Sequence, residues 1–341
     1  MTPAAHASLD LLRRFAPGSP LREAAELIMA QGTGALILIG TGTKVDSFVA
    51  GGFRLVDTPF TAQRLAELAK MDGGIVVDDA SSTIVAANVH FMPDPSIDTA
   101  ETGTRFRTAE RLARQTGATV LSVSEEGYLR AVVFAGEARF TLQSTTALLA
   151  EANQRLQSLE RIRKQFDESV AQLDRYETEG IASVSDVVAV IQRAAVICGI
   201  GDDLDTIAAE LGDSASVISL QAEDLEKGVA DIAELVYADY HHPKPRKGTS
   251  VFRRLAELGH DDLYSAETIG SVIGFAALDD DASPRGIRAL AEVPRLPIAV
   301  RDAILKRFNS FGRLTSASAA DLAEVEGVGP ARAETIRSYL A

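Results

Sequence analysis

Residues 88–108 read NVHFMPDPSIDTAETGTRFRT, a strand pattern joined to a helical one by a loop rich in hydroxyls and arginine. The loop ends in a Thr-Gly-Thr run at 102–104, and Arg105 and Arg107 follow at once. Small residues let a backbone approach a ligand closely, and a guanidinium offers a rigid fork of donors that fits phosphate. A helix starting at Thr108 would add the positive end of its dipole. The stretch predicts an anion site, and an ordinary helix cap with two solvated arginines is the alternative.

A second motif lies upstream at Asp72-Gly73-Gly74, where an Asp-Gly-Gly turn directly precedes an apolar strand pattern. Earlier still come the pair Gly51-Gly52 and the strand pattern 35–40. The order and spacing of these elements, together with the segment 102–108, resemble the diadenylate cyclase family in its DNA-integrity scanning (DisA) branch. The resemblance covers the whole chain, with a cyclase domain, a helical middle and a C-terminal DNA-binding module.

That resemblance implies a reaction. Two ATP molecules would condense to cyclic di-AMP, each 3′-hydroxyl attacking the α-phosphate of the other nucleotide and expelling pyrophosphate. One cyclase domain of this type holds one ATP, so two domains must face each other. The resemblance therefore also implies self-association, as a homo-octamer.

The resemblance assigns roles to individual residues. Asp72 would bind a divalent cation, Mg²⁺ or Mn²⁺, and help to activate the 3′-hydroxyl; without the resemblance it reads as an ordinary Asp-Gly turn. Arg105 and Arg107 would stabilise the charge that develops at the reacting phosphorus. Further ATP contacts are implied for Gly73, Phe91, Thr104, Phe106, Thr108 and Ser124.

Three positions depart from the family pattern. Gly74 stands where relatives have the alanine of Asp-Gly-Ala, and losing that methyl costs about 0.5–1 kcal/mol in backbone entropy. Phe106 replaces the histidine of Arg-His-Arg, and phenylalanine neither carries a proton nor hydrogen-bonds a phosphate. If the histidine contact strengthens in the transition state, its loss slows the reaction roughly 10²–10³-fold; if the histidine mainly packs, Phe106 fills the same space. Glu125, beside Ser124, places a carboxylate where it would repel a triphosphate.

Composition narrows the class of protein. The 341 residues allow two or three domains, and 46% of them are hydrophobic, enough for sizeable cores. We expect no transmembrane helix, because the sequence has no run of eighteen apolar residues, and no secretory signal, because the N-terminus lacks an apolar segment. The single cysteine, Cys198, excludes an internal disulfide and a cysteine-built metal cage. These features predict a cytoplasmic protein without membrane contact.

Charge is distributed unevenly. The net charge is −14, yet the segment from Arg285 onward carries nine Lys/Arg against six Asp/Glu. The chain before it therefore carries −17. This asymmetry predicts that only the C-terminal end meets nucleic acid.

Strand and helix patterns alternate up to residue 140 and predict a three-layer α/β domain over 1–140. Helices are expected at 8–30, 61–70 and 108–116, and strands at 35–40, 45–49, 74–78, 83–89, 119–123 and 129–134. Residues 141–284 are expected to form an all-α spine. Its expected helices are one long amphipathic helix over 141–177 and further helices over 183–198, 203–211 and 216–238.

The remaining segment, 285–341, holds the strongest local motif. Two helical patterns are joined by Gly327-Val328-Gly329, which resembles the helix–hairpin–helix motif of DNA-binding proteins. The exposed N–H groups of such a hairpin, together with the N-terminus of the following helix, bind a phosphate without contacting the bases. Arg332 would add positive charge next to them. A degraded upstream copy has Pro-Arg-Leu-Pro at 294–297, which removes two donors and leaves Arg295 to help by charge. The alternative is a plain pair of packed helices.

Three functions stay open at this level. The first is a diadenylate cyclase regulated by branched or damaged DNA, such as junctions, bound through backbone and shape. The second is a nucleotide- and DNA-binding oligomer of the same family that has lost most catalysis through Phe106. The third is an unrelated, non-enzymatic DNA-binding scaffold.

Overall fold

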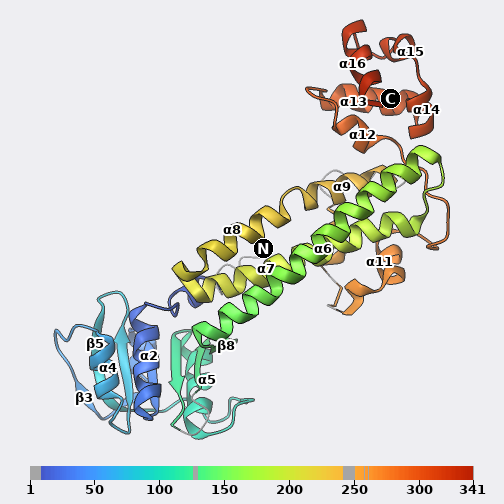
Figure 1. Cartoon of the computed structure of the whole chain (residues 1–341). Helices are drawn as coiled ribbons and strands as arrows, with labels where there is room; N and C mark the ends of the chain where they lie inside the picture. The colour runs from blue at the N-terminus through green and yellow to red at the C-terminus, as the bar shows by residue number, and fades with distance from the viewer. Residues whose placement is uncertain (1–8, 126–129, 241–249, 257, 260, 341) are drawn as a thin grey trace. The chain divides into compact units, whose positions relative to one another are not determined.

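The structure is a computed structural model that describes residues 9–125, 130–240, 250–256, 258–259 and 261–340 (Figure 1). Internal contacts divide the chain into two compact units. The first unit comprises residues 1–152 with 206–217, and the second comprises 153–205 with 218–341.

The first unit is built on an eight-stranded mixed sheet with the order β2-β5-β4-β1-β6-β7-β8, and β3 also pairs with β5. The central pair β1–β4 is parallel, whereas the other pairings of the described strands are antiparallel. The starts of β1 and β4 therefore share one edge of the sheet with the ends of β5 and β6. The strands are β1 (Ala35–Ile39), β2 (Val49–Ala50), β3 (Phe53–Arg54), β4 (Gly74–Asp78), β5 (Thr83–Phe91), β6 (Thr119–Val123), β7 (Ala131–Ala135) and β8 (Ala138–Leu142).

Helices cover both faces of this sheet and give the three layers that the alternating patterns predict (Figure 1). The helices α2 (Pro20–Gln31) and α4 (Ala62–Leu68) pack on one face. The helix α5 (Thr104–Thr116) packs on the other. The central strands are largely apolar because both of their faces are buried, although β6 also contains Thr119 and Ser122.

Some local expectations for this unit are wrong. The expected helix 8–30 is interrupted after residue 13, and α2 starts anew at Pro20, capped by Ser19. Pro20 sits at a first helical position because it lacks the N–H that would continue a preceding helix. The expected strand 45–49 is instead the end of a one-turn helix, α3 (Thr43–Asp46), followed by β2. Of the expected strand 129–134, residue 129 lies outside the described residues, residue 130 precedes the strand, and residues 131–134 belong to β7.

The second unit is helical. The two expected helices over 183–211 are one, because Gly199 and Gly201 stay helical within α7. The expected helix 216–238 is broken in two at Gly228, which adopts a left-handed φ of 76°. The helices before residue 280 are α6 (Thr145–Glu179), α7 (Val184–Leu211), α8 (Ser216–Glu226), α9 (Val229–Tyr240), α10 (Val251–Leu255) and α11 (Ala266–Ile273). The start of α6, the end of α7 and the start of α8 belong to the first unit.

One helical stretch, Val184–Tyr240, is long and apolar enough by length and composition to cross a membrane, although the sequence patterns predict no such segment. Half of its most apolar window is buried inside the protein. Val187, Ile191 and Ala194 are fully buried within it. Its apolar character is therefore that of a core helix.

Five short helices form the end of the chain around their own apolar core (Figure 1). The core includes Leu290, Ile304, Leu322 and Ile336, all fully buried. The helices are α12 (Ile287–Ala291), α13 (Ile298–Phe308), α14 (Phe311–Ser316), α15 (Ala319–Ala323) and α16 (Pro330–Leu340).

The carboxylate of Asp239, near the end of α9, anchors this end of the chain to the helices before it. Asp239 is 1% exposed and accepts four backbone N–H bonds at the start of α12. Its Oδ1 takes those of Arg285, Gly286 and Ile287 at 2.7–2.9 Å, and its Oδ2 takes that of Arg288 at 3.0 Å. One side chain thus caps the first helix of the module.

Charged contacts surround this anchor. The guanidinium of Arg288 lies 2.7 Å from carboxylates of both Asp174 and Glu177 on α6. The hydroxyl of Tyr240 donates to Glu177. Burial raises the pKa of Glu177, and the nearby Arg288 offsets part of that effect. These contacts form a polar network at the junction, in which Arg288 and Glu177 are buried and Asp174 is exposed.

Candidate functional site

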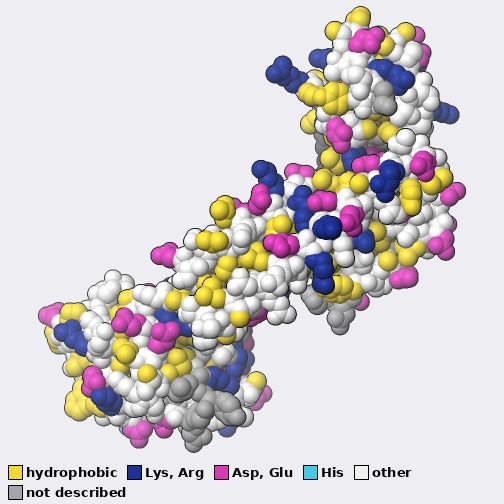
Figure 2. Space-filling view, in the orientation of Figure 1, with side chains coloured by type: hydrophobic (Ala, Val, Ile, Leu, Met, Phe, Trp, Pro, Cys, Tyr) yellow, Lys and Arg dark blue, Asp and Glu magenta, His cyan; other side chains and the backbone are white. Residues whose placement is uncertain are grey.

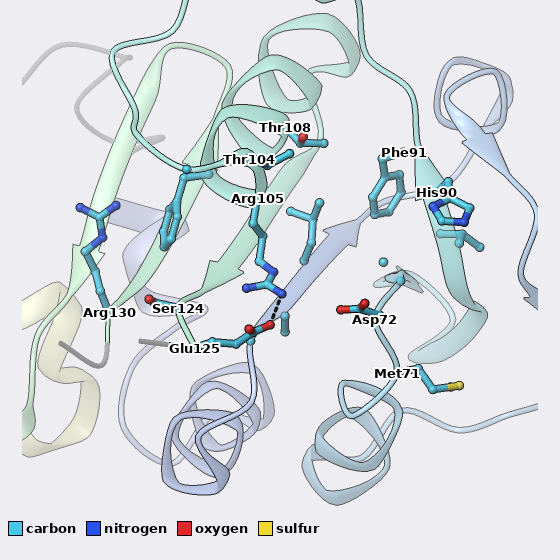
Figure 3. A pocket seen from close by; sticks show the side chains of 18 of the residues that line it. Met71, Asp72, His90, Phe91, Thr104, Arg105, Thr108, Ser124, Glu125 and Arg130 are labelled. Carbon is cyan, nitrogen blue, oxygen red and sulfur yellow. Dashed lines mark hydrogen bonds and ion pairs between the residues drawn. The ribbon is translucent and has the colours of Figure 1, made fainter. Parts of the chain in front are cut away.

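A cavity of about 1200 Å³ opens at the sheet edge where β1 and β4 begin and β5 and β6 end. Figure 3 shows Asp72 and Phe91 on one side of it and Arg105 and Arg130 facing them. Its walls come from segments far apart in the chain, namely 34–36, 71–74, 89–91, 102–106 with Thr108, and 124–125 with Arg130. The topology therefore sets an acidic turn opposite a cationic wall.

The turn before β4 holds Asp72 at the rim of the cavity. A Cβ built on Gly73 would lie within 2.6 Å of three atoms of Asn88, so only glycine lets β5 cross here. Asn88 itself adopts a left-handed φ of 54°, within a register shift between β4 and β5. Asp72 is exposed and lines the cavity. The Asp-Gly pair is thus fixed by close backbone packing.

The N-terminus of α5 forms the opposite wall. Its cap residue, Gly103, has a φ of 84° and makes no side-chain capping bond. The helical ladder starts with the N–H of Arg107, which donates to the carbonyl of Gly103 at 3.1 Å. The preceding N–H groups, of residues 104–106, belong to the first turn, where a helix leaves its donors unpaired. These donors and the helix dipole favour an anion.

The loop before α5 is held against that helix by arginines. Nε of Arg111 donates to the carbonyl of Ile97 at 2.8 Å, and its Nη2 donates to that of Pro95 at 2.7 Å. Arg114 donates to the carbonyl of Asp98 at 2.6 Å. The approach of the chain to the cavity is thus fixed by three charge-assisted bonds.

Phe106 is a packing residue that also lines the cavity. It is 7% exposed and belongs to the apolar core beneath α5. The guanidinium carbon of Arg130 lies 4.3 Å from the centre of its ring, a cation–π contact. The Glu101 carboxylate pairs with Arg130 at 3.0 Å and also with Arg139. Phe106 therefore packs in the core and contacts a cation at the cavity.

Arg105 is paired with Glu125 on the same side of the cavity (Figure 3). The Arg105 side chain is 27% exposed and that of Glu125 is 51% exposed, so the pair faces solvent in part. A Cβ on Gly34 would lie within 2.7 Å of atoms of both side chains, so glycine there makes room for the pair. An anion bound by Arg105 has to compete with the Glu125 carboxylate.

Eight of the residues expected to contact nucleotide line this cavity: Asp72, Gly73, Phe91, Thr104, Arg105, Phe106, Thr108 and Ser124. Arg107 is exposed and does not line it. The helix was expected from Thr108 but begins at Thr104, and residues two apart on a helix face nearly opposite directions. Arg105 and Thr108 therefore share the cavity face, and Arg107 does not. Sequence reasoning missed Gly34, His90 and Arg130, which sit at strand ends without a local motif.

The C-terminal module contains two hairpins of the same geometry. Gly327 adopts a left-handed φ of 85°, and Arg295 adopts 56° at the equivalent place in the upstream copy. A Cβ on Gly327 would lie 2.9 Å from Cγ2 of Val300, so the two copies pack closely. Arg332 is exposed and bonds back to the carbonyl of Gly327.

The hairpins present backbone and cations to solvent. Gly329 is exposed, whereas the side chain of Val328 is buried in the core, so Val328 offers only its backbone. Lys and Arg side chains project at several points of this module (Figure 2). Such a surface suits phosphate contacts rather than base readout.

Comparison with known proteins identifies the family of each part of the chain. Residues 22–137 match the family model "DisA bacterial checkpoint controller nucleotide-binding", and residues 142–281 match "DisA bacterial checkpoint controller linker region". Residues 310–339 match the helix-hairpin-helix motif. The DNA integrity scanning protein DisA of Kineococcus radiotolerans is 43% identical over 332 residues, covering 96% of this chain and 92% of its own.

The chain belongs to the DisA family. The DisA proteins of a Parafrankia species and of Symbiobacterium thermophilum are 42% and 39% identical to it. They cover 96% and 97% of this chain and 93% and 94% of their own lengths. The DisA nucleotide-binding match spans the whole cavity. The family assignment confirms an α/β nucleotide-binding domain, a helical linker and a helix–hairpin–helix region.

Proposed function

We propose that this DisA family member is a diadenylate cyclase that condenses two ATP into cyclic di-AMP and two pyrophosphates. At each centre a bond forms between a 3′-oxygen and an α-phosphorus, and the bond from that phosphorus to the bridging oxygen breaks to release pyrophosphate. The hydroxyl proton passes to a base, for which the Asp72 carboxylate is the candidate. The observation that carries the proposal is the cavity itself, with the Asp72 carboxylate facing Arg105, Arg130 and the open start of α5.

The residues divide into two groups. The first turn of α5 with Thr104, Arg105 and Thr108 would bind the phosphates, and Ser124 would add a hydroxyl donor. Arg105 would stabilise charge in the transition state. Arg107 lies outside the cavity and would serve a nucleotide held by a facing copy. The proposal therefore requires self-association, for which a homo-octamer is the expected state.

The turn that holds Asp72 would supply both the base that accepts the 3′-hydroxyl proton and a ligand for the metal. No cluster of three His, Cys, Asp or Glu side chains capable of holding a metal occurs among the described residues. Mg²⁺ does not need one, because it commonly binds one or two carboxylates together with substrate phosphates and water. Asp72, exposed at the rim, fits that requirement, and a bound Mg²⁺ or Mn²⁺ would supply positive charge to the phosphates.

Incubation of the purified protein with ATP and Mg²⁺ or Mn²⁺ tests the proposal, with products separated by chromatography and the Phe106→His variant run in parallel. We expect cyclic di-AMP from the unmodified protein, because Phe106 packs and holds Arg130. Product from the variant alone would assign chemistry to the replaced histidine. Product from neither would overturn the cyclase proposal.

The ion pair in the cavity favours a second candidate, a nucleotide-binding oligomer with low turnover. Glu125 pairs with Arg105 and would repel triphosphate oxygens. Under this candidate ATP binds, but Arg105 is held away from the reacting phosphorus. The effect of the Glu125 carboxylate on ATP can be measured as a change in binding affinity, without turnover.

We expect Glu125→Gln to tighten ATP binding about tenfold, because the amide keeps the shape and removes the competing charge. Isothermal titration calorimetry without turnover, using a non-hydrolysable ATP analogue, measures this. Glu137→Gln is the matched control, since Glu137 is 80% exposed and pairs with Arg114 rather than with a cavity residue. Weaker binding by Glu125→Gln would instead make Glu125 a favourable contact, for example to the metal.

We propose that the helix–hairpin–helix module binds branched DNA, such as junctions, through backbone and shape, with Gly327, Val328, Gly329, Arg332 and Arg295 at the contact. The matching motif and the exposed hairpin support this. The upstream copy has Pro297 where the downstream copy has Gly329, so it offers one donor fewer there. We therefore propose that the downstream hairpin, Gly327-Val328-Gly329, makes most of the phosphate contacts.

Gly329→Pro is expected to weaken junction binding about tenfold, because it removes one hairpin N–H. Gly329→Ala is the matched control: a Cβ there meets nothing within 4 Å, and the N–H remains. Fluorescence anisotropy with a labelled four-way junction at two salt concentrations reports both affinity and phosphate contacts. Equal affinity of the two variants would remove this hairpin from the interface.

A further inference from the structure

The space beside Gly74 is filled by the ring of Phe91. Gly74 is buried at the start of β4, and Phe91 lies at the end of the neighbouring strand β5. A Cβ built on Gly74 would lie within 3.0 Å of three carbons of that ring. Ordinary contacts of a Cβ begin near 3.4 Å, so even one methyl group excludes the ring from its present position. The position of Phe91 therefore depends on glycine at 74.

Phe91 is anchored on one side and open on the other. It packs against the apolar core under α5, yet it is half-buried and lines the cavity. In Figure 3 its ring stands on the wall with Asp72, away from Arg105 and Arg130. A ligand whose phosphates lie at the cationic wall would place its uncharged end toward this ring. A flat heteroaromatic base is the group that an aromatic face binds best.

We propose that Gly74 and Phe91 form one specificity unit, in which Phe91 packs on the purine base and Gly74 is the positioning residue that admits the ring. This inference rests on the proposed function, since it takes the cavity ligand to be ATP. It gives Gly74 a role that backbone freedom alone does not, because its φ is not in the left-handed region. The pair selects purine over pyrimidine nucleotides through the larger stacking area.

The test measures binding of ATP, CTP and inorganic tripolyphosphate to the full chain by calorimetry. Gly74→Ala is expected to weaken ATP binding about tenfold and to reduce the preference for ATP over CTP, because it displaces the ring. Tripolyphosphate affinity is expected to stay within twofold, because it uses only the cationic wall. Phe91→Leu is expected to show the same pattern of losses.

The double variant Gly74→Ala/Phe91→Leu separates coupling from two independent losses. Once the ring is gone, the added methyl has less to displace, so the double variant is expected to bind ATP no more weakly than Phe91→Leu. Additive losses, or full ATP affinity in both single variants, would overturn the inference. Phe91→Leu carries the test alone if Gly74→Ala does not fold. Failure of the unmodified protein to bind either ATP or tripolyphosphate would refute the proposed function instead.

Discussion

Replacing Asp72 with asparagine is expected to abolish cyclic di-AMP formation, with a loss of at least about 10²–10³-fold in turnover. The asparagine side chain keeps the size of the group, but it neither accepts the 3′-hydroxyl proton nor supplies an anionic metal ligand. The close packing of Gly73 against Asn88 fixes the turn independently of the carboxylate, so the fold is expected to survive. Product chromatography measures the loss, and analytical ultracentrifugation checks that the oligomer is intact.

Asp79→Asn is the matched control for this variant. Asp79 is 57% exposed, pairs with Arg14 at 2.8 Å and is not among the residues that line the cavity. It is expected to leave turnover unchanged. Undiminished product from Asp72→Asn would remove Asp72 from the mechanism while leaving nucleotide binding possible.

The second large effect is expected on stability. Asp239→Ala leaves four backbone N–H groups at the start of α12 without their acceptor in a buried place. Removing one partner of a buried charged contact typically costs roughly 3–5 kcal/mol. We expect the C-terminal module to detach at lower denaturant than the rest, giving a two-step unfolding curve and early proteolysis near residues 279–285.

Two further variants calibrate this result. Asp239→Asn retains an oxygen that can accept the three bonds now made by Oδ1 and is expected to lose less stability than alanine. Asp231→Ala, at an exposed position in the first turn of α9, is expected to stay within about 0.5 kcal/mol of the parent. A single cooperative transition at the parent midpoint for Asp239→Ala would show that other contacts anchor the module.

Much of the fold was predictable because its signals are local. Short apolar runs that alternate with helical patterns identify the central strands, and the Gly-Val-Gly hairpin at 327–329 identifies the C-terminal module. Errors arise where two local signals compete. A helix could start at any of three threonines, Thr102, Thr104 or Thr108. The N-cap is in fact Gly103, and glycine has no side chain that could mark the cap in the sequence. That four-residue difference decides which of the two arginines reaches the cavity.

The candidate site was predictable only in part, because its geometry is set by pairs far apart in the chain. Nothing near Gly74 in the sequence shows that the ring of Phe91 will occupy its missing methyl. Likewise, Arg130 carries no motif, and only the fold brings it over Phe106. From the sequence, the phenylalanine at 106 meant either a lost phosphate contact or a packing residue, and only the structure shows its buried ring in contact with the Arg130 guanidinium.

The dispersed origin of the cavity walls has a consequence for folding. The segments between residues 34 and 130 are brought together by the pairing of β1 with both β4 and β6, and these two non-local pairings cost loop entropy. Because the walls of the cavity come from segments far apart in the chain, a nucleotide is expected to bind the folded domain and not the unfolded chain. At about 100 times its dissociation constant such a ligand adds roughly 2.7 kcal/mol to stability. ATP would then stabilise the folded domain by binding to it, even in a protein that converts no ATP to product.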